Sequence, residues 1–221
     1  MLPLQGDVAA RSAPLAVGAL IVANALVFAT GAWRDPVETV EWIERWGLVP
    51  RLFVAALDGA PSLAWLTPLT AMFLHGGLLH LAGNALYLWI FGRPIEDLLG
   101  ARRFAIFYAA CGLAAALVHV AAAPSSYLPT IGASGAVSGL LGAYAVSYPT
   151  GRLRLLWPPV RVPAIAFLFL WIAIQIASGV SSWGGTGGGV AWWAHVGGFV
   201  AGAGLARSLW VRRPTKSRQS I

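Results

Sequence analysis

Long apolar runs alternate with short polar connections along most of the chain. Six runs stand out, at residues 15–32, 74–91, 104–123, 131–147, 163–180 and 190–211. A helix needs about 20 mostly apolar residues to cross the hydrocarbon core of a bilayer, and each run comes close to that length. The pattern predicts an all-α polytopic membrane protein, a bundle of six transmembrane helices with little chain left for a soluble domain.

The one long connection, residues 33–68, has a different pattern. Acidic side chains are interspersed there with tryptophan and aliphatic side chains, and proline and glycine divide the segment. Tryptophan is favoured at the membrane surface, where amphipathic helices lie along the bilayer plane. We therefore expect short amphipathic helices in the outer interface; a folded extracellular loop is an equally good interpretation.

Composition supports membrane insertion, and charge indicates the orientation. The 221-residue chain is 58% hydrophobic and 10% charged, with a mean hydropathy of +0.72, too apolar for a soluble domain of this size. With successive connections on opposite sides, every basic residue except Arg34, Arg45 and Arg51 falls on one side. Since basic residues concentrate in the cytoplasm, both termini are predicted to be cytoplasmic. The net charge of +7 is then a topology signal and indicates no nucleic-acid partner.

These features divide the chain into a short cytoplasmic N-terminus (1–14), a six-helix domain (15–211) and a basic cytoplasmic tail (212–221). The first run is long for the core of a cleavable signal peptide, and no good cleavage site follows it. The chain has 14 arginines and one lysine. That bias is typical of GC-rich bacterial genomes and predicts a multi-pass protein of the bacterial inner (plasma) membrane.

Polar side chains inside apolar runs are costly and therefore mark candidate functional sites. Counted from the outer ends of their runs at 1.5 Å per residue, His80, Ser134 and His195 lie at similar depths, on the order of 5 to 9 Å. Asn84 follows His80 by four residues and so shares its helix face. Three separate helices thus bring polar groups to one level of the predicted bundle.

These residue types suit acyl transfer. A serine hydroxyl becomes a nucleophile when a neighbouring base accepts its proton, and His195 is the one histidine of the later runs. His80 and Asn84 can donate hydrogen bonds to an oxyanion, as can the backbone N–H of Ser134. The predicted site therefore has Ser134 as nucleophile and His195 as general base.

Small residues surround the proposed nucleophile. Gly132 and Gly135, on either side of Ser134, would leave room for a substrate backbone. Glycines spaced four residues apart also let transmembrane helices approach closely. Two such pairs occur, Gly135 with Gly139 and Gly198 with Gly202.

Acidic and metal-binding groups are missing from the runs. All eight Asp and Glu residues fall outside them, so no carboxylate can orient His195, and an aspartyl protease is excluded. The sequence has no HExxH zinc motif, and its one lysine, Lys216, lies in the tail, which excludes a Ser-Lys dyad. The sequence therefore predicts a Ser-His dyad with no metal and no cofactor.

Each candidate also has a plain structural interpretation. Taken alone, Ser134 is more often a helix-packing serine, His195 a buried histidine bonded to a carbonyl, and Asn84 an interhelical hydrogen-bonding residue. Their combination at one depth favours the dyad.

The two remaining histidines are expected to be structural. His75 lies five residues before His80, about 140° around a helix at 100° per residue, so it should face elsewhere. His119 lies near the outer end of its run and is expected at the membrane interface.

Three motifs resemble those of the rhomboid intramembrane serine proteases: GASGAVSG with Ser134, AHVGGFVAG with His195, and HGGLLHLAGN with His80 and Asn84. The resemblance covers roughly residues 15–211. It implies that Ser134 is the nucleophile, that His195 is the base, and that His80 and Asn84 line the oxyanion site. It also implies that segment 33–68 lies partly in the membrane, and that the fifth helix and residues 181–189 gate substrate entry.

Two positions depart from the family pattern. Many rhomboids carry Trp-Arg shortly before the first histidine of the second helix, whereas Trp65 is followed here by Leu66. Relatives often place an aromatic residue one turn after the nucleophile, stacked on the catalytic histidine, and this chain has Ser138. His195 is then expected to be held in another way, such as packing against Gly135 and Gly139.

The expected function is a serine-type endopeptidase that hydrolyses peptide bonds in or next to transmembrane segments of other membrane proteins. One rival is a catalytically silent rhomboid-like protein that binds and escorts membrane proteins; it would normally have lost Ser134 or His195. A second rival is a transporter. It would need polar groups that continue toward the cytoplasm, whereas the inner halves of the runs are almost wholly apolar.

Overall fold

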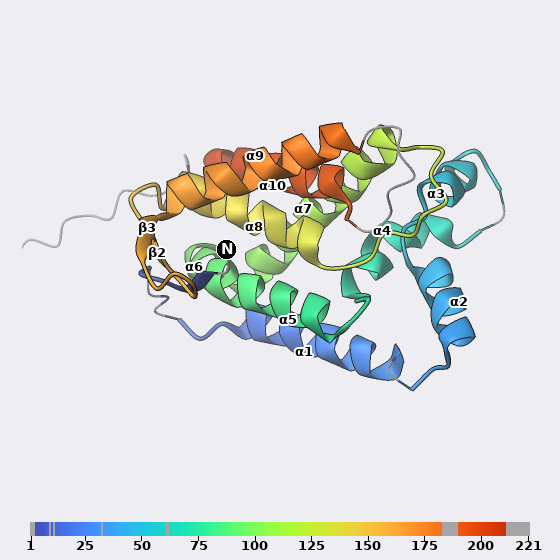
Figure 1. The fold of residues 1–221 in the computed structure, drawn as a ribbon, viewed down its shortest axis with the longest axis horizontal. Coiled ribbons are helices and arrows are strands. Elements are labelled where there is room, and N and C mark those ends of the chain that lie inside the picture. The colour runs from blue at the N-terminus through green and yellow to red at the C-terminus, as the bar shows by residue number, and fades with distance from the viewer. Residues whose placement is uncertain are drawn as a thin grey trace, which may run out of the picture.

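The computed structural model describes residues 3–8, 10, 12–31, 33–60, 62–182 and 190–210. Most of these residues are helical (Figure 1). The long helices are α1 (Leu15–Gly31), α5 (Leu78–Tyr87), α7 (Ala101–Ala122), α8 (Ser134–Ser147), α9 (Ala164–Ser181) and α10 (Trp192–Trp210). A helix therefore forms within each of the six apolar runs. The predicted tail 212–221 and most of the predicted gating segment 181–189 lie outside the described residues.

The second run forms a longer helix than its apolar stretch. α5 continues without interruption through a π-helical turn, η3 (Leu88–Gly92), into α6 (Arg93–Leu99). Pro94 explains the local change, because its nitrogen has no hydrogen to donate to the carbonyl four residues earlier. The helix thereby extends past the predicted cytoplasmic end of the run.

Helix α8 starts three residues later than its apolar run. Gly132 has a φ of 116°, a backbone conformation that excludes it from a helix and suits glycine. Its N–H donates to the carbonyl of Ala71 at 2.8 Å. The chain turns sharply there, and Ser134 becomes the first residue of the helix.

The connection 33–68 contains α2 (Pro36–Trp46) and α3 (Pro50–Leu57), followed by the short turns η1 (Ala64–Leu66), α4 (Thr67–Thr70) and η2 (Ala71–Phe73). Asp35 begins α2 by accepting a hydrogen bond from the N–H of Glu38 at 2.9 Å. The predicted short helices are confirmed. Their position in the outer interface stays a prediction.

Backbone hydrogen bonds fix this connection without the family's Trp-Arg pair. Leu48 and Thr130 exchange both of their backbone hydrogen bonds, at 2.9 and 2.8 Å. The Thr70 hydroxyl donates to the carbonyl of Trp46 at 2.7 Å. The side chains of Leu48 and Phe53 pack in a small buried cluster. The connection is thus attached to the segment that leads into Ser134.

A small antiparallel sheet corrects the all-α prediction. Its strands, in the order β1 (Pro3–Gly6), β2 (Arg152–Leu155) and β3 (Arg161–Pro163), join the N-terminus to the connection between the fourth and fifth apolar runs. The sequence RLRL alternates exposed arginines with the buried Leu153 and Leu155. Period-two alternation is the signature of a half-buried strand, and it is short enough here to be overlooked.

Helix α8 runs through the middle of the structure, with α9 and α10 on one side and α5 and α1 on the other (Figure 1). Residues 136–144 of α8 are all buried. α9 differs, since Phe169 is 73% exposed and several neighbouring aliphatic side chains are also exposed. By length and apolar composition alone, two described helices, α7 and α9, qualify to cross a membrane. The six-span topology stays a prediction.

Candidate functional site

Ser134 lies where α8 begins. The preceding residue, Ala133, is buried and supplies no side-chain cap to the helix. The first backbone N–H groups of a helix have no partner within the helix. Ser134 therefore combines a half-buried hydroxyl with N–H groups that can bind an anion.

His195 lies in the first turn of α10, and the structure places it against Ser134. Its Nε2 atom is 2.9 Å from the Ser134 hydroxyl oxygen, within hydrogen-bond distance. The two residues are 61 positions apart in the sequence, so the contact depends on how α8 and α10 pack.

Glycines bring these two helices together. A Cβ atom added to Gly198 would overlap the carbonyl oxygen of Gly135, and one added to Gly202 would overlap the carbonyl oxygen of Gly139. The close approach predicted for the two small-residue pairs is confirmed, and the pairs meet each other. The backbones of α8 and α10 are therefore in contact within about one turn of the Ser134–His195 pair and again one turn further along both helices.

The other ring nitrogen of His195 contacts Gln175, a residue to which the sequence motifs assign no role. This nitrogen, Nδ1, lies 2.6 Å from the side-chain oxygen of Gln175 on α9, and Gln175 is only 6% exposed. A polar amide inside an apolar run was the signal available for it. Its partner could not be read because the relative rotation of two helices is not visible in the sequence.

Tryptophans flank the His195 ring in place of the family's aromatic residue on α8. The centroid of Trp171, one turn before Gln175 on α9, is 5.8 Å from that of His195, and the Trp192 centroid is 6.4 Å away. These contacts come from α9 and α10, and the expected packing of His195 against Gly135 and Gly139 stays a prediction. A Cβ atom added to either glycine would first meet α7, at Ala115 or at Cys111.

His80 and Asn84 meet the chain at Gly132. A Cβ atom added to Gly132 would lie 2.7 Å from His80 Nε2 and 3.7 Å from Asn84 Nδ2. The N–H of Gly76 donates to His80 Nδ1 at 3.4 Å, a long contact that favours a hydrogen on Nε2. The structure therefore brings two potential donors next to the residue that lies two positions before Ser134.

A side chain at Gly135 would point toward two neighbouring helices. A Cβ atom added there would be 2.7 Å from the Cβ of Ala115 and 3.9 Å from that of Ala194. This side of Gly135 faces α7 and α10, so its small size serves helix packing. Gly132 is the glycine beside His80 and Asn84.

His75 does not face away from His80, as the helical spacing suggested. The two rings are 5.1 Å apart, edge to face. The helix begins at Leu78, so the 100° step does not apply to His75. His119 bonds the Thr130 hydroxyl at 2.9 Å through Nε2, which ties the end of α7 to the segment before Ser134.

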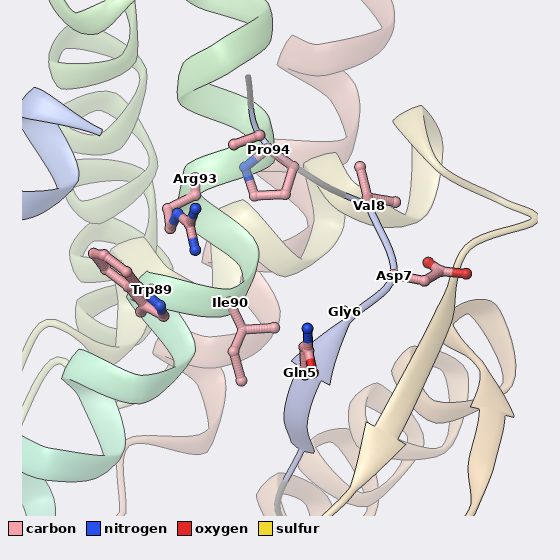
Figure 2. A pocket seen from close by; sticks show the side chains of 9 residues that line it. Gln5, Gly6, Asp7, Val8, Trp89, Ile90, Arg93 and Pro94 are labelled. Atoms are coloured by element: carbon pink, nitrogen blue, oxygen red, sulfur yellow. The ribbon is translucent and has the colours of Figure 1, made fainter. Parts of the chain in front are cut away.

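A pocket of about 430 Å³ lies away from these residues, between β1 and the junction of α5 with α6 (Figure 2). Trp89 and Arg93 form one wall, with the guanidinium carbon 4.4 Å from the indole centroid, and residues 5–8 form the other. The described residues that line the pocket include no serine, cysteine or histidine. The candidate site is therefore the Ser134 region and not this pocket.

Comparison with known proteins supplies the family context. A family model described as the Rhomboid domain matches residues 63–212. The mitochondrial presenilin-associated rhomboid-like protein of Mus musculus is 32% identical over 148 residues, 65% of this chain and 36% of that protein. The rhomboid protease GluP of Bacillus subtilis (strain 168) is 35% identical over 144 residues, 64% of this chain and 26% of that protein.

A third relative, the mitochondrial Rhomboid protein 1 of Saccharomyces cerevisiae (strain ATCC 204508 / S288c), is 28% identical over 190 residues, 84% of this chain and 51% of that protein. The chain thus spans between about a quarter and half of the length of these relatives. The residues matched by the Rhomboid model include all four predicted site residues, His80, Asn84, Ser134 and His195.

Proposed function

The chain belongs to the rhomboid family, and we propose that it is an intramembrane serine endopeptidase. It would cleave peptide bonds in or next to the transmembrane segments of membrane proteins. The observation that supports this most strongly is the 2.9 Å approach of His195 Nε2 to the Ser134 hydroxyl oxygen at the start of α8. The name of the Bacillus relative, a rhomboid protease, agrees with the proposal.

In the proposed reaction, the Ser134 oxygen attacks the scissile carbonyl carbon while its proton passes to His195 Nε2. The developing oxyanion accepts hydrogen bonds from His80, Asn84 and the N–H of Ser134. His195 then gives the proton to the leaving amine, and an acyl-enzyme remains. Water, deprotonated by His195, attacks that ester, and the carboxyl product leaves as Ser134 regains its proton.

The proposal includes the arrangement in the membrane. The family and the mostly helical structure identify a helical membrane protein. We propose that residues 15–211 form the protease domain with six spans, that both termini are cytoplasmic, and that transmembrane proteins are the substrates. Fusing a reporter that is active only outside the cytoplasm to residue 221 would test the orientation. Activity of that reporter would contradict it.

The relatives come from more than one cellular setting. The three relatives described above come from a bacterium and from mitochondria. The bacterial plasma membrane inferred from the arginine-rich composition gains no support from them. The relatives and the family assignment both support a location in a membrane.

The direct test is cleavage of a transmembrane reporter in proteoliposomes. The unaltered protein should cleave it, while folded Ser134→Ala and His195→Ala variants should lose at least about 10³-fold in rate. Ser147→Ala, a serine variant at the other end of α8, serves as the control and should cleave normally. Absence of cleavage by the folded, unaltered protein across several reporters would instead support the escort function.

A further inference from the structure

We propose that Gln175 is a positioning residue that fixes the proton of His195 on Nδ1 and so keeps Nε2 free to accept the proton of Ser134. This inference rests on the proposed dyad and adds a third member to it. Gln175 touches neither Ser134 nor a substrate, and it acts through the imidazole alone.

The geometry of the two contacts defines the tautomer. An amide oxygen only accepts hydrogen bonds, so the 2.6 Å contact with Gln175 requires a hydrogen on Nδ1. A neutral imidazole carries one ring hydrogen, which leaves the Nε2 lone pair directed at the Ser134 oxygen, 2.9 Å away. That is the form in which a histidine serves as a base for serine.

A neutral amide suits this location better than the carboxylate of a soluble triad. Gln175 lies within an apolar helix and is 6% exposed. An ionised carboxylate there would carry a large desolvation penalty, whereas an amide with its oxygen bonded costs much less. All eight acidic residues of the chain lie outside the apolar runs. The chain thus orients its histidine without a membrane-buried negative charge.

The same helix supports the ring in a second way. Trp171 precedes Gln175 by four residues and so projects from the same side of α9. Its ring is tilted 38° from that of His195, at a centroid distance of 5.8 Å. One face of α9 therefore supplies both the hydrogen bond to the edge of the imidazole and an aromatic neighbour, in a chain that has Ser138 where relatives often have the aromatic residue.

The test is nitrogen NMR of the full chain labelled with ¹⁵N-histidine, with His195 assigned by its loss in His195→Ala. The unaltered protein should carry the His195 hydrogen on Nδ1. Gln175→Leu should give a mixture of tautomers and lower kcat about 10- to 100-fold at nearly unchanged KM. Gln175→Glu, which should stay protonated and uncharged at this buried position, retains a carbonyl oxygen as acceptor and should restore both the tautomer and most of kcat.

Asn24→Leu is the matched control, because Asn24 is another buried amide, 2% exposed, on α1. It should leave the His195 tautomer and kcat unchanged. The inference is overturned if the hydrogen lies on Nε2 in the unaltered protein, which would mean that the Gln175 amide presents its NH₂ group. It is also overturned if Gln175→Leu keeps the normal tautomer or the normal kcat. Loss of cleavage in Ser134→Ala and His195→Ala would still uphold the dyad in either case.

Discussion

Two helices hold His195, and they do so in different ways. α10 carries the residue and packs on α8 backbone to backbone, so that a Cβ atom on Gly198 would overlap the Gly135 carbonyl. α9 exposes large side chains such as Phe169 and reaches the imidazole with two side chains, Trp171 and Gln175. The difference shows that contact between helix backbones sets the distance between Ser134 and His195, whereas side chains from a largely exposed helix set the orientation of the ring.

The largest effect is expected where the backbones meet. A Cβ atom on Gly202 would overlap the carbonyl oxygen of Gly139, so Gly202→Ala should separate α10 from α8. We expect it to lower the free energy of unfolding by about 1–3 kcal/mol and to abolish cleavage. Denaturant unfolding in detergent micelles and the reporter assay measure the two effects.

Gly204→Ala is the control for Gly202→Ala, on the same helix. Among the described residues, no atom outside the helix's own backbone lies within 4 Å of a Cβ atom added to Gly204. Alanine favours a helix over glycine by about 0.5–1 kcal/mol. It should therefore be neutral or slightly stabilising and keep full activity. If Gly202→Ala and Gly204→Ala have the same stability and the same cleavage activity, the backbones of α8 and α10 are not in close contact at Gly202.

A second large effect is expected at Gly132, where α5 meets the site. Alanine there would be strained by the φ of 116°, and its Cβ atom would lie 2.7 Å from His80 Nε2. Displacing an oxyanion donor costs about 10²- to 10³-fold in kcat, so Gly132→Ala should lose activity on that scale. Steady-state cleavage of the reporter measures it.

Gly76→Ala provides the comparison for Gly132→Ala, because its added Cβ atom would make an ordinary 3.5 Å contact with Ile131. It should retain activity within a few-fold of normal. If Gly132→Ala is as active as Gly76→Ala, His80 has no part in stabilising the oxyanion.

The smallest effect is expected from Ser138, which occupies the position of the missing aromatic residue. Its hydroxyl donates to the carbonyl oxygen of Ser134 at 2.6 Å. Removing it in Ser138→Ala should cost about 1 kcal/mol of stability and change kcat only a few-fold, because the glycine contacts still fix the backbone. Unfolding and cleavage assays measure both.

Ser147→Ala removes the same type of bond at the other end of α8, where the hydroxyl donates to the carbonyl of Ala143 at 2.6 Å. The two variants should lose similar stability. A 100-fold loss of kcat in Ser138→Ala alone would mean that this hydroxyl, and not helix contact, positions Ser134.

The sequence pattern was sufficient for the features that depend on one helix at a time. Apolar length located each of the six helices, and glycine spacing predicted a close helix approach at each of the two glycine pairs, although not that the pairs meet each other. Gln175 was visible as a polar residue in an apolar run, but its bond to His195 depends on how α9 is rotated against α10. His75 was misplaced because the start of α5 at Leu78 could not be read from an apolar run that begins earlier.

The small sheet was missed for a related reason. Its strands have three or four residues each, and β1 pairs with β2 across most of the chain, Gly6 with Leu153 for example. Pairing at such a sequence separation leaves only a weak local signal. The sequence RLRL does alternate as a strand does, but its two arginines also fit the basic residues that were interpreted as a topology signal.

The central claim is that His195 activates Ser134, and mapping a fluorophosphonate adduct by mass spectrometry tests it most directly. The probe should modify Ser134 in the unaltered protein, and the modification should be lost in folded His195→Ala although the serine is still present. An adduct on another residue, or equal labelling of Ser134 without His195, would contradict the account.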